Sequence, residues 1–231
     1  MLIVGFCGKK QSGKSTCAKY AVDFFSNQVI TYEHPDGGKG YKTLKVAVVP
    51  MAGLLKQFCV DVLGLAVADV CGDDKAKSKL TQYRWEDMPH YEKLRPTWLE
   101  WLKGKRVPSG FMTVRQVLQE VGTGIFRQMN MNIWVLAWLR YVKTLSADVV
   151  LVDDIRFPNE IDFVRAQGGK VIKVLGGHTN DNHVSENSVE DWDEADEFIF
   201  GNSHTTKENM LINLDRYLES LSPYYRNSEC S

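Results

Sequence analysis

One eight-residue stretch near the N-terminus has residue types and spacing suited to holding phosphate. Gly8-Lys-Lys-Gln-Ser-Gly-Lys-Ser15 matches the pattern G-x-x-x-x-G-K-[ST] at every position. Glycines let successive backbone N–H groups point inward, a lysine reaches the outer phosphates, and a serine hydroxyl can ligate Mg²⁺. The stretch therefore predicts a nucleotide-binding loop, and we assign to it Gly8, Gln11, Ser12, Gly13, Lys14, Ser15 and Thr16, with Ser15 as a metal ligand.

Two carboxylates end an apolar run in the second half of the chain. Asp148-Val-Val-Leu-Val-Asp153-Asp154 reads as a buried strand followed by acids. In proteins with such a loop, an acid at the end of a neighbouring strand holds the Mg²⁺ shell. We expect Asp153 to be that acid, with Asp154 as the second choice.

Four polar side chains are candidates for binding further phosphate groups. Arg115 and Gln119 are spaced to share one face of a helix, Arg127 follows a break that contains glycines, and Arg156 lies three residues beyond Asp153. Phosphoryl transfer spreads negative charge over oxygens that guanidinium groups can bind in pairs. The alternative for each arginine is a surface ion pair, which contributes little to stability.

The elements that must position these residues form an alternating pattern. Apolar runs without strict alternation, typical of strands covered on both faces, are separated by stretches with helical periodicity. This order predicts a parallel α/β sheet of five strands flanked by helices. The expected strands are 2–7, 44–49, 148–152, 170–175 and 197–200.

Three segments interrupt the alternation. Residues 31–43 predict an inserted hairpin, residues 69–110 predict a basic, aromatic helical insertion with Trp85, Trp98 and Trp101, and residues 176–193 predict an acidic lid. We expect all of them to belong to one domain that covers residues 1–231.

The net charge of −1 conceals two opposed segments. Residues 75–106 hold nine Lys or Arg against four acids, a local +5, whereas residues 178–200 hold eight acids and no Lys or Arg. The total excludes a uniformly basic nucleic-acid-binding surface, although local DNA contact through the insertion stays open.

Five scattered cysteines without paired spacing predict reduced thiols, and the first residues do not have the pattern of a secretory leader. No apolar run is long enough to span a bilayer. We therefore expect a soluble cytoplasmic protein with no membrane partner. The histidines His90, His178, His183 and His204 form no cluster with cysteine that would indicate zinc.

With these motifs, the chain resembles a known family, the phage-type deoxynucleoside monophosphate kinases. It resembles phosphomevalonate kinase more distantly. The resemblance is carried by the loop 8–15, Met51–Lys56, Arg115–Arg127 with Trp134, Val152–Glu160, Gly168-Gly169 and His183–Glu186. These motifs cover most of the chain outside the insertions.

The resemblance implies a P-loop core like that of nucleoside monophosphate kinases, with ATP and Mg²⁺ at the donor side. It implies a deoxynucleotide acceptor contacted by Arg115, Gln119, Thr123 and Arg127, and a lid over 178–193. No arginine lies between Arg165 and Arg216, so charge stabilisation is expected from Lys14, Arg127, Arg156 or the basic insertion. By analogy, Asn202 lies where adenine-site loops occur in related folds.

Other functions fit the same motifs. The chain lacks the N-K-x-D motif of GTPases. Some phage kinases that resemble this family phosphorylate the hydroxymethyl group of a modified pyrimidine, of the 5-hydroxymethyluracil type, in phage DNA, and the basic insertion would suit such an acceptor. An ATP-binding homologue without activity is a third hypothesis, which the intact Lys14, Ser15 and Asp153 disfavour. The cytoplasm would be that of the host if the protein is phage-encoded, and the oligomeric state stays open, with a homodimer among the options.

Overall fold

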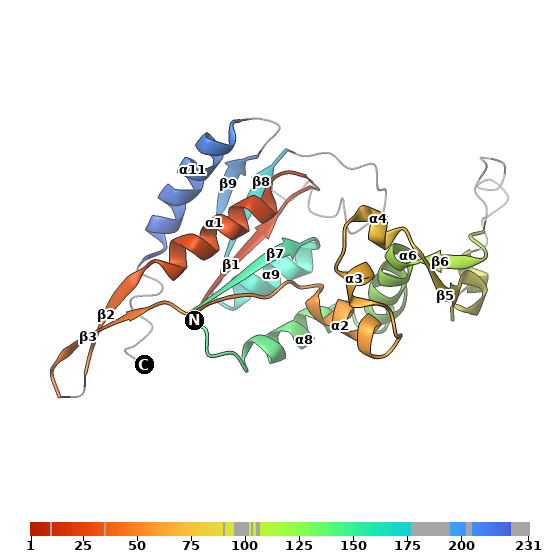
Figure 1. Cartoon of the computed structure of the whole chain (residues 1–231), viewed down its shortest axis with the longest axis horizontal. Helices are drawn as coiled ribbons and strands as arrows, with labels where there is room; N and C mark the ends of the chain where they lie inside the picture. The colour runs from red at the N-terminus through yellow and green to blue at the C-terminus, as the bar shows by residue number, and fades with distance from the viewer. Residues whose placement is uncertain are drawn as a thin grey trace. The chain divides into compact units, whose positions relative to one another are not determined.

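The computed structural model divides into two compact units (Figure 1). It describes residues 1–9, 11–34, 36–89, 91–94, 102, 104, 107–176, 195–201 and 205–222. Unit 1 comprises Met1–Met51 and Val135–Ser231, and unit 2 comprises Ala52–Trp134. Among the described residues, unit 1 contains two buried apolar clusters and unit 2 contains one.

A five-stranded parallel sheet forms the centre of unit 1, in the order β4-β7-β1-β8-β9 (Figure 1). Each strand coincides with one of the expected apolar runs, so the predicted fold class is confirmed. The strand expected over residues 148–152 continues three residues further, to Ile155. The strands are β1 (Leu2–Cys7), β4 (Val46–Val48), β7 (Val149–Ile155), β8 (Lys170–Leu175) and β9 (Glu197–Phe200).

Helices cover both faces of this sheet. One face packs against α1 (Lys14–Ser26) and α11 (Lys207–Ser220), and the other against α8 (Ile133–Val142) and α9 (Pro158–Ala166). The connection through α1 leads from β1 towards β4, whereas α9 leads from β7 towards β8 in the opposite direction along the sheet. Right-handed crossovers therefore place these two helices on opposite faces.

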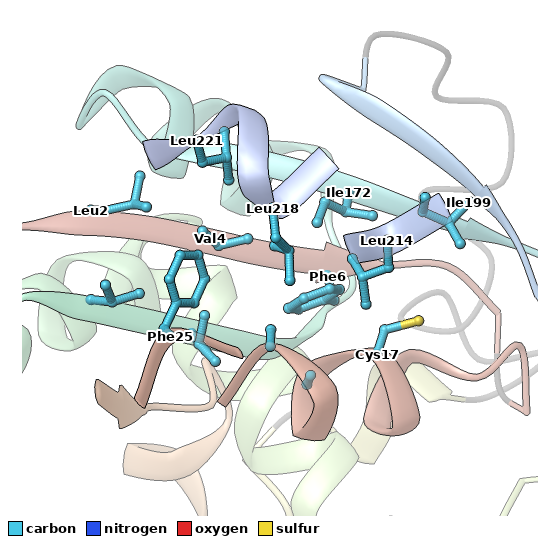
Figure 2. Close-up of a cluster of buried hydrophobic side chains, with 14 of the residues drawn as sticks. Leu2, Val4, Phe6, Cys17, Phe25, Ile172, Ile199, Leu214, Leu218 and Leu221 are labelled. Atoms are coloured by element: carbon cyan, nitrogen blue, oxygen red, sulfur yellow. The ribbon is translucent and has the colours of Figure 1, made fainter. Parts of the chain in front are cut away.

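The cluster between α1, α11 and the sheet is fully apolar at its centre. Figure 2 shows Phe6 of β1 between Cys17 and Leu214, with Phe25 near the other end of α1. All four side chains have no exposed surface. Burying each of the large apolar ones contributes about 2 kcal/mol, so this contact fixes α1 and the loop before it against the sheet.

The insert predicted over residues 31–43 forms an antiparallel hairpin. Its strands are β2 (Val29–Glu33) and β3 (Lys39–Thr43), and Gly37 in the connecting turn has a φ of 85°. Ile30 is buried against the main cluster of unit 1, which attaches the base of the hairpin.

Unit 2 is mostly helical, with one short antiparallel ribbon. Its core includes Cys59, Met112, Val117 and Val121. The elements are α2 (Gly53–Asp61), α3 (Val67–Val70), α4 (Asp74–Lys77), β5 (Leu80–Arg84), η1 (Trp85–Asp87), η2 (Tyr91–Leu94), β6 (Phe111–Thr113), α6 (Val114–Gln119), the π-helix η3 (Glu120–Phe126) and α7 (Arg127–Met129).

The insertion expected over residues 69–110 is not helical throughout. Residues 80–84 alternate between inward Thr81 and Tyr83 and outward Leu80, Gln82 and Arg84, and they pair with β6. This period of two fits a strand, and the partner lies some 30 residues later in the chain, so local patterns do not reveal it.

Candidate active site

The loop between β1 and α1 has a backbone that few residue types accept. Gly8 and Gly13 have φ values of 135° and 109°, and a Cβ on Gly8 would lie 2.3 Å from the Val174 carbonyl oxygen. Gln11 has a φ of 63° and is the only non-glycine residue with a positive φ in the described part of the chain. Such conformations cost free energy and are concentrated at functional sites. This geometry agrees with the expected phosphate-binding loop.

Ser12 is completely buried inside the loop. No hydrogen-bond partner of its Oγ is found among the described residues. Its carbonyl oxygen packs against Gly201, just after β9, where a Cβ would lie only 2.0 Å away. A buried hydroxyl without a protein partner is available to a ligand held by the loop.

Lys14 begins α1, and its ammonium lies over the loop. Nζ donates to the Gly8 carbonyl oxygen at 2.7 Å and also to the Lys9 carbonyl oxygen. Burial and the nearby Arg156 guanidinium lower the Lys14 pKa to about 8, while Asp153 and Asp154 oppose that change. The structure thus brings the predicted Lys14, Asp153 and Arg156 together at the carboxyl edge of the sheet.

The end of β7 is irregular where it carries the two carboxylates. Val149 and Leu151 pack on the α1 side of the sheet, and Val150 and Val152 pack on the α8 and α9 side. The pairing with β1 shifts between Gly5 and Cys7, and Ile155 packs on the α8 and α9 side, so strict alternation does not continue through Asp153 and Asp154. Asp154 Oδ1 accepts the Met51 N–H at 2.6 Å.

The remaining donor-side residues occupy the first turn of α1. The Thr16 N–H donates to the Gly13 carbonyl oxygen at 2.9 Å, and Ser15 is exposed. A serine hydroxyl and an aspartate carboxylate are both hard oxygen donors of the kind that Mg²⁺ prefers. Among the described residues, no three His, Cys, Asp or Glu side chains gather as a metal site. Asn202, Lys10 and residues 177–193 of the expected lid lie outside the described residues.

Glu160 fixes the turn that carries Arg156, a role that we did not assign from the sequence. It is 3% exposed, and its Oε2 accepts the backbone N–H groups of Arg156 at 2.7 Å and Phe157 at 3.1 Å. Pro158 is the first residue of α9. The signal was present in the sequence, because a Glu three residues after a helix start reaches back to cap it.

Lys173 is a buried cation near the loop that lies outside the loop motif. It is 6% exposed and pairs in the sheet with Cys7, which immediately precedes Gly8. Burial raises the pKa of the Cys7 thiol to about 12, although Lys173 and Lys14 act in the opposite direction. Cys7 is therefore a protonated core thiol at neutral pH, not a nucleophile. The available signal was a lysine flanked by apolar residues inside the run 170–175.

In unit 2, Thr113 and Gln116 form a capping box at the start of α6. The Thr113 Oγ1 accepts the Gln116 N–H at 3.3 Å, and the Gln116 side chain accepts the Thr113 N–H at 2.8 Å. Arg115 and Gln119 then lie one turn apart on α6. Arg115 Nη2 contacts Asp74 Oδ1 at 2.5 Å, so this arginine takes part in the ion pair that was the alternative to phosphate binding.

The break expected before Arg127 is instead a continuous π-helix. Gly122 within η3 packs against Leu55, and its carbonyl oxygen accepts the indole N–H of the buried Trp134 at 3.0 Å. Thr123 lies in the same element. Arg127 follows directly, is 6% exposed and donates from Nη1 to the Met131 carbonyl oxygen at 3.2 Å. Glycines here permit close packing and do not end the helix, and π-helices are frequent at functional sites.

Two described cations of the basic insertion are paired with acids. Lys79 contacts Asp69 at 2.5 Å, and Arg84 contacts Glu86 at 3.3 Å while also covering the Phe111 ring. Trp85 packs against the core of unit 2, whereas Trp98 and Trp101 lie outside the described residues.

The fold and the loop together define an α/β P-loop protein of the nucleoside monophosphate kinase-like class. Within that class, a family model described as deoxynucleotide monophosphate kinase matches residues 102–210. A protein of Acanthamoeba polyphaga mimivirus described as "Putative deoxynucleotide monophosphate kinase" is 24% identical over 200 residues, which cover 80% of this chain and 81% of that protein. The resemblance of this chain to the deoxynucleotide monophosphate kinase family is thereby confirmed.

The matched residues 102–210 include Arg115, Gln119, Thr123, Arg127, Asp153 and Arg156, but not the loop 8–15. Within the described residues, no helix is both long and apolar enough to span a membrane.

Proposed function

We propose that this protein is a nucleotide kinase that transfers the γ-phosphate of ATP to a deoxynucleoside monophosphate. The family match and the viral relative support a nucleotide kinase. The single observation that carries the proposal is the geometry of the loop 8–15, in which Gly8, Gln11 and Gly13 have positive φ values and the buried Ser12 Oγ has no hydrogen-bond partner among the described residues. A loop of this kind, followed by a helix that begins with a lysine, is suited to holding phosphate groups.

The donor site would be formed by the loop and the start of α1. Backbone N–H groups of the loop would hold the β- and γ-phosphates, and the buried Ser12 hydroxyl would supply one more hydrogen bond. The Ser15 hydroxyl and the Asp153 carboxylate would hold Mg²⁺, directly or through water. When bound, this ion would neutralise charge on the phosphates.

The transfer itself needs charge stabilisation more than covalent chemistry. An oxygen of the acceptor phosphate forms a bond to the γ-phosphorus, the bond from the γ-phosphorus to the β,γ-bridging oxygen breaks, and ADP leaves. Lys14 and Arg156 are the residues of unit 1 that would stabilise the equatorial oxygens. The Lys14 ammonium is held by the Gly8 carbonyl oxygen, and the backbone of Arg156 is held by Glu160.

The acceptor would be bound by Arg115, Gln119, Thr123 and Arg127 of unit 2. Arg127 is the strongest candidate of these, because it is 6% exposed and directly follows the π-helix whose Gly122 packs against Leu55 and accepts a hydrogen bond from Trp134. A planar guanidinium can bind two oxygens of a monophosphate at once.

The acceptor class is tested by incubating the protein with γ-labelled ATP and Mg²⁺. One series contains each of the four common deoxynucleoside monophosphates, and a parallel series contains DNA with 5-hydroxymethyluracil. We expect label in at least one deoxynucleoside diphosphate and none in DNA. Label in DNA alone would overturn the proposed acceptor, and label in neither, with active ATP binding, would favour the inactive homologue.

A further inference from the structure

Unit 1 contains the segment that leads to unit 2 and the segment that returns from it, and a hydrogen bond within unit 1 links these two segments. The chain leaves unit 1 after Met51 and returns at Val135. Trp138, three residues after the return and fully buried, donates its indole N–H to the Val49 carbonyl oxygen at 2.9 Å. Helix α8, through which the chain returns, is therefore hydrogen-bonded to Val49, two residues before the departing segment ends at Met51.

Asp154 holds the last residue of the departing segment. The Val49 N–H donates to the Leu151 carbonyl oxygen at 2.9 Å, Pro50 has no N–H to donate, and the Met51 N–H donates to Asp154 Oδ1 at 2.6 Å. The Met51 side chain is 2% exposed and packs in the same cluster as Trp138. A short hydrogen bond from an amide to a carboxylate is among the stronger ones in proteins.

The same carboxylate lies within electrostatic reach of the phosphate-binding lysine. Asp154 acts on Lys14 in the direction that favours the charged ammonium, against burial and Arg156. Asp154 therefore contacts the departing segment directly while its charge acts on the donor site. Asp153 is the acid expected to serve the metal.

We propose that Asp154 is a positioning residue for the acceptor-binding unit, which it serves by fixing the Met51 amide where the chain departs from the sheet. This inference rests on the proposed function, because it assigns acceptor binding to unit 2. The Asp154 side chain has two properties that can be tested separately, a hydrogen-bond acceptor and a negative charge. The carboxylate oxygen positions the Met51 amide, and the negative charge balances the donor-site cations.

Two substitutions separate these properties. Asp154→Asn keeps an oxygen that can accept the Met51 N–H but removes the charge, and Asp154→Ala removes both. We expect Asp154→Ala to raise the KM for the deoxynucleoside monophosphate about tenfold, the equivalent of one lost hydrogen bond to a charged group. Asp154→Asn should restore the KM for the acceptor to within about twofold of the original, because its side-chain oxygen still accepts the Met51 N–H.

Amide hydrogen exchange gives a readout that does not depend on catalysis. In Asp154→Ala, exchange in the peptide that contains Met51 should be faster than in the unaltered protein, and in Asp154→Asn it should be unchanged. Trp138→Phe, which breaks the other tie at Val49, provides a second variant should Asp154→Ala fail to fold. It should likewise raise the KM for the acceptor with little effect on ATP affinity.

Three results would overturn the inference. They are an unchanged acceptor KM in a folded Asp154→Ala protein, equal losses in the Ala and Asn variants, or no change in exchange at Met51. Failure of the proposed function would give a different pair of results. The unaltered protein would then phosphorylate no deoxynucleoside monophosphate, while amide exchange at Met51 would still differ between the Ala and Asn variants.

Discussion

At the scale of single residues, the charge balance around Lys14 is the feature from which function follows. A lysine with an ordinary pKa is fully charged at neutral pH, whereas burial and Arg156 bring the Lys14 pKa down to about 8. The Lys14 ammonium therefore loses its proton at a pH of about 8, at which most proteins stay folded. Between pH 8 and 10.5 the unfolded chain holds this proton and the folded chain does not, so the contribution of Lys14 to stability rises with pH across that range.

This balance predicts the pH dependence of ATP binding. Affinity should fall as the pH rises through about 8, because the ammonium that contacts the phosphates is deprotonated. Arg156→Gln removes the repulsion, raises the Lys14 pKa and should move the midpoint of this loss to a higher pH. Isothermal titration calorimetry from pH 7 to 10 measures it. Arg140→Gln, an exposed arginine on α8, is the control and should leave the midpoint in place, and an unmoved midpoint in Arg156→Gln would refute the assignment.

At the scale of elements, the loop is held by strand ends that lie far from it in sequence. The Gly8 backbone lies against the Val174 carbonyl oxygen, and the Ser12 carbonyl oxygen lies against Gly201. These contacts come from the ends of β8 and β9. The loop conformation is therefore a property of the sheet edge as well as of the glycines in the motif.

Gly201→Ala tests this support. A Cβ at this position would lie 2.0 Å from the Ser12 carbonyl oxygen and 2.5 Å from that of Leu175, both backbone atoms that cannot move independently. We expect a loss of stability of about 1–3 kcal/mol and weaker ATP binding, measured by thermal unfolding with and without ATP. In the control Gly38→Ala, the nearest atom is the end of the Asp36 side chain at 3.3 Å, and little change is expected. Equal behaviour of the two variants would show that the Gly201 contact does not support the loop.

Local patterns predicted the elements whose periodicity is complete within one segment. The five strands and the hairpin after α1 follow from such patterns. The β5–β6 ribbon and the π-helix before Arg127 did not, because the first depends on pairing between distant segments and the second on Trp134 and Leu55 packing against Gly122. At the site, the roles of Lys14, Asp153 and Arg156 stay predictions from the motifs, whereas the contacts of Asp154 and Glu160 with backbone amides required the folded chain.

At the scale of the whole molecule, the candidate residues divide between the two units. Lys14, Asp153 and Arg156 belong to unit 1, and Arg115, Gln119, Thr123 and Arg127 belong to unit 2. In the proposed kinase, the donor would bind to unit 1 and the acceptor to unit 2. Substitutions should therefore affect one substrate and spare the other.

Arg127→Lys tests the division, because it keeps the charge and removes the planar fork. We expect the KM for the acceptor to rise by about tenfold or more, with ATP affinity within twofold of the original. Arg115→Lys is the informative companion, since the contact of Arg115 with Asp74 predicts a smaller effect. Steady-state kinetics with each substrate varied in turn separates these effects. An equal loss of ATP affinity in Arg127→Lys would contradict the division.

The most direct test of the account is transfer of label from γ-labelled ATP to a deoxynucleoside monophosphate by the unaltered protein and by Lys14→Ala. Lys19→Ala, an exposed lysine on the same helix, is the matched control. We predict a loss of transfer of at least about a hundredfold in Lys14→Ala, the scale for removing one group that stabilises charge in a transition state, and no significant loss in Lys19→Ala. Full transfer by a correctly folded Lys14→Ala protein would contradict the central claim that this loop and its lysine carry the phosphoryl transfer.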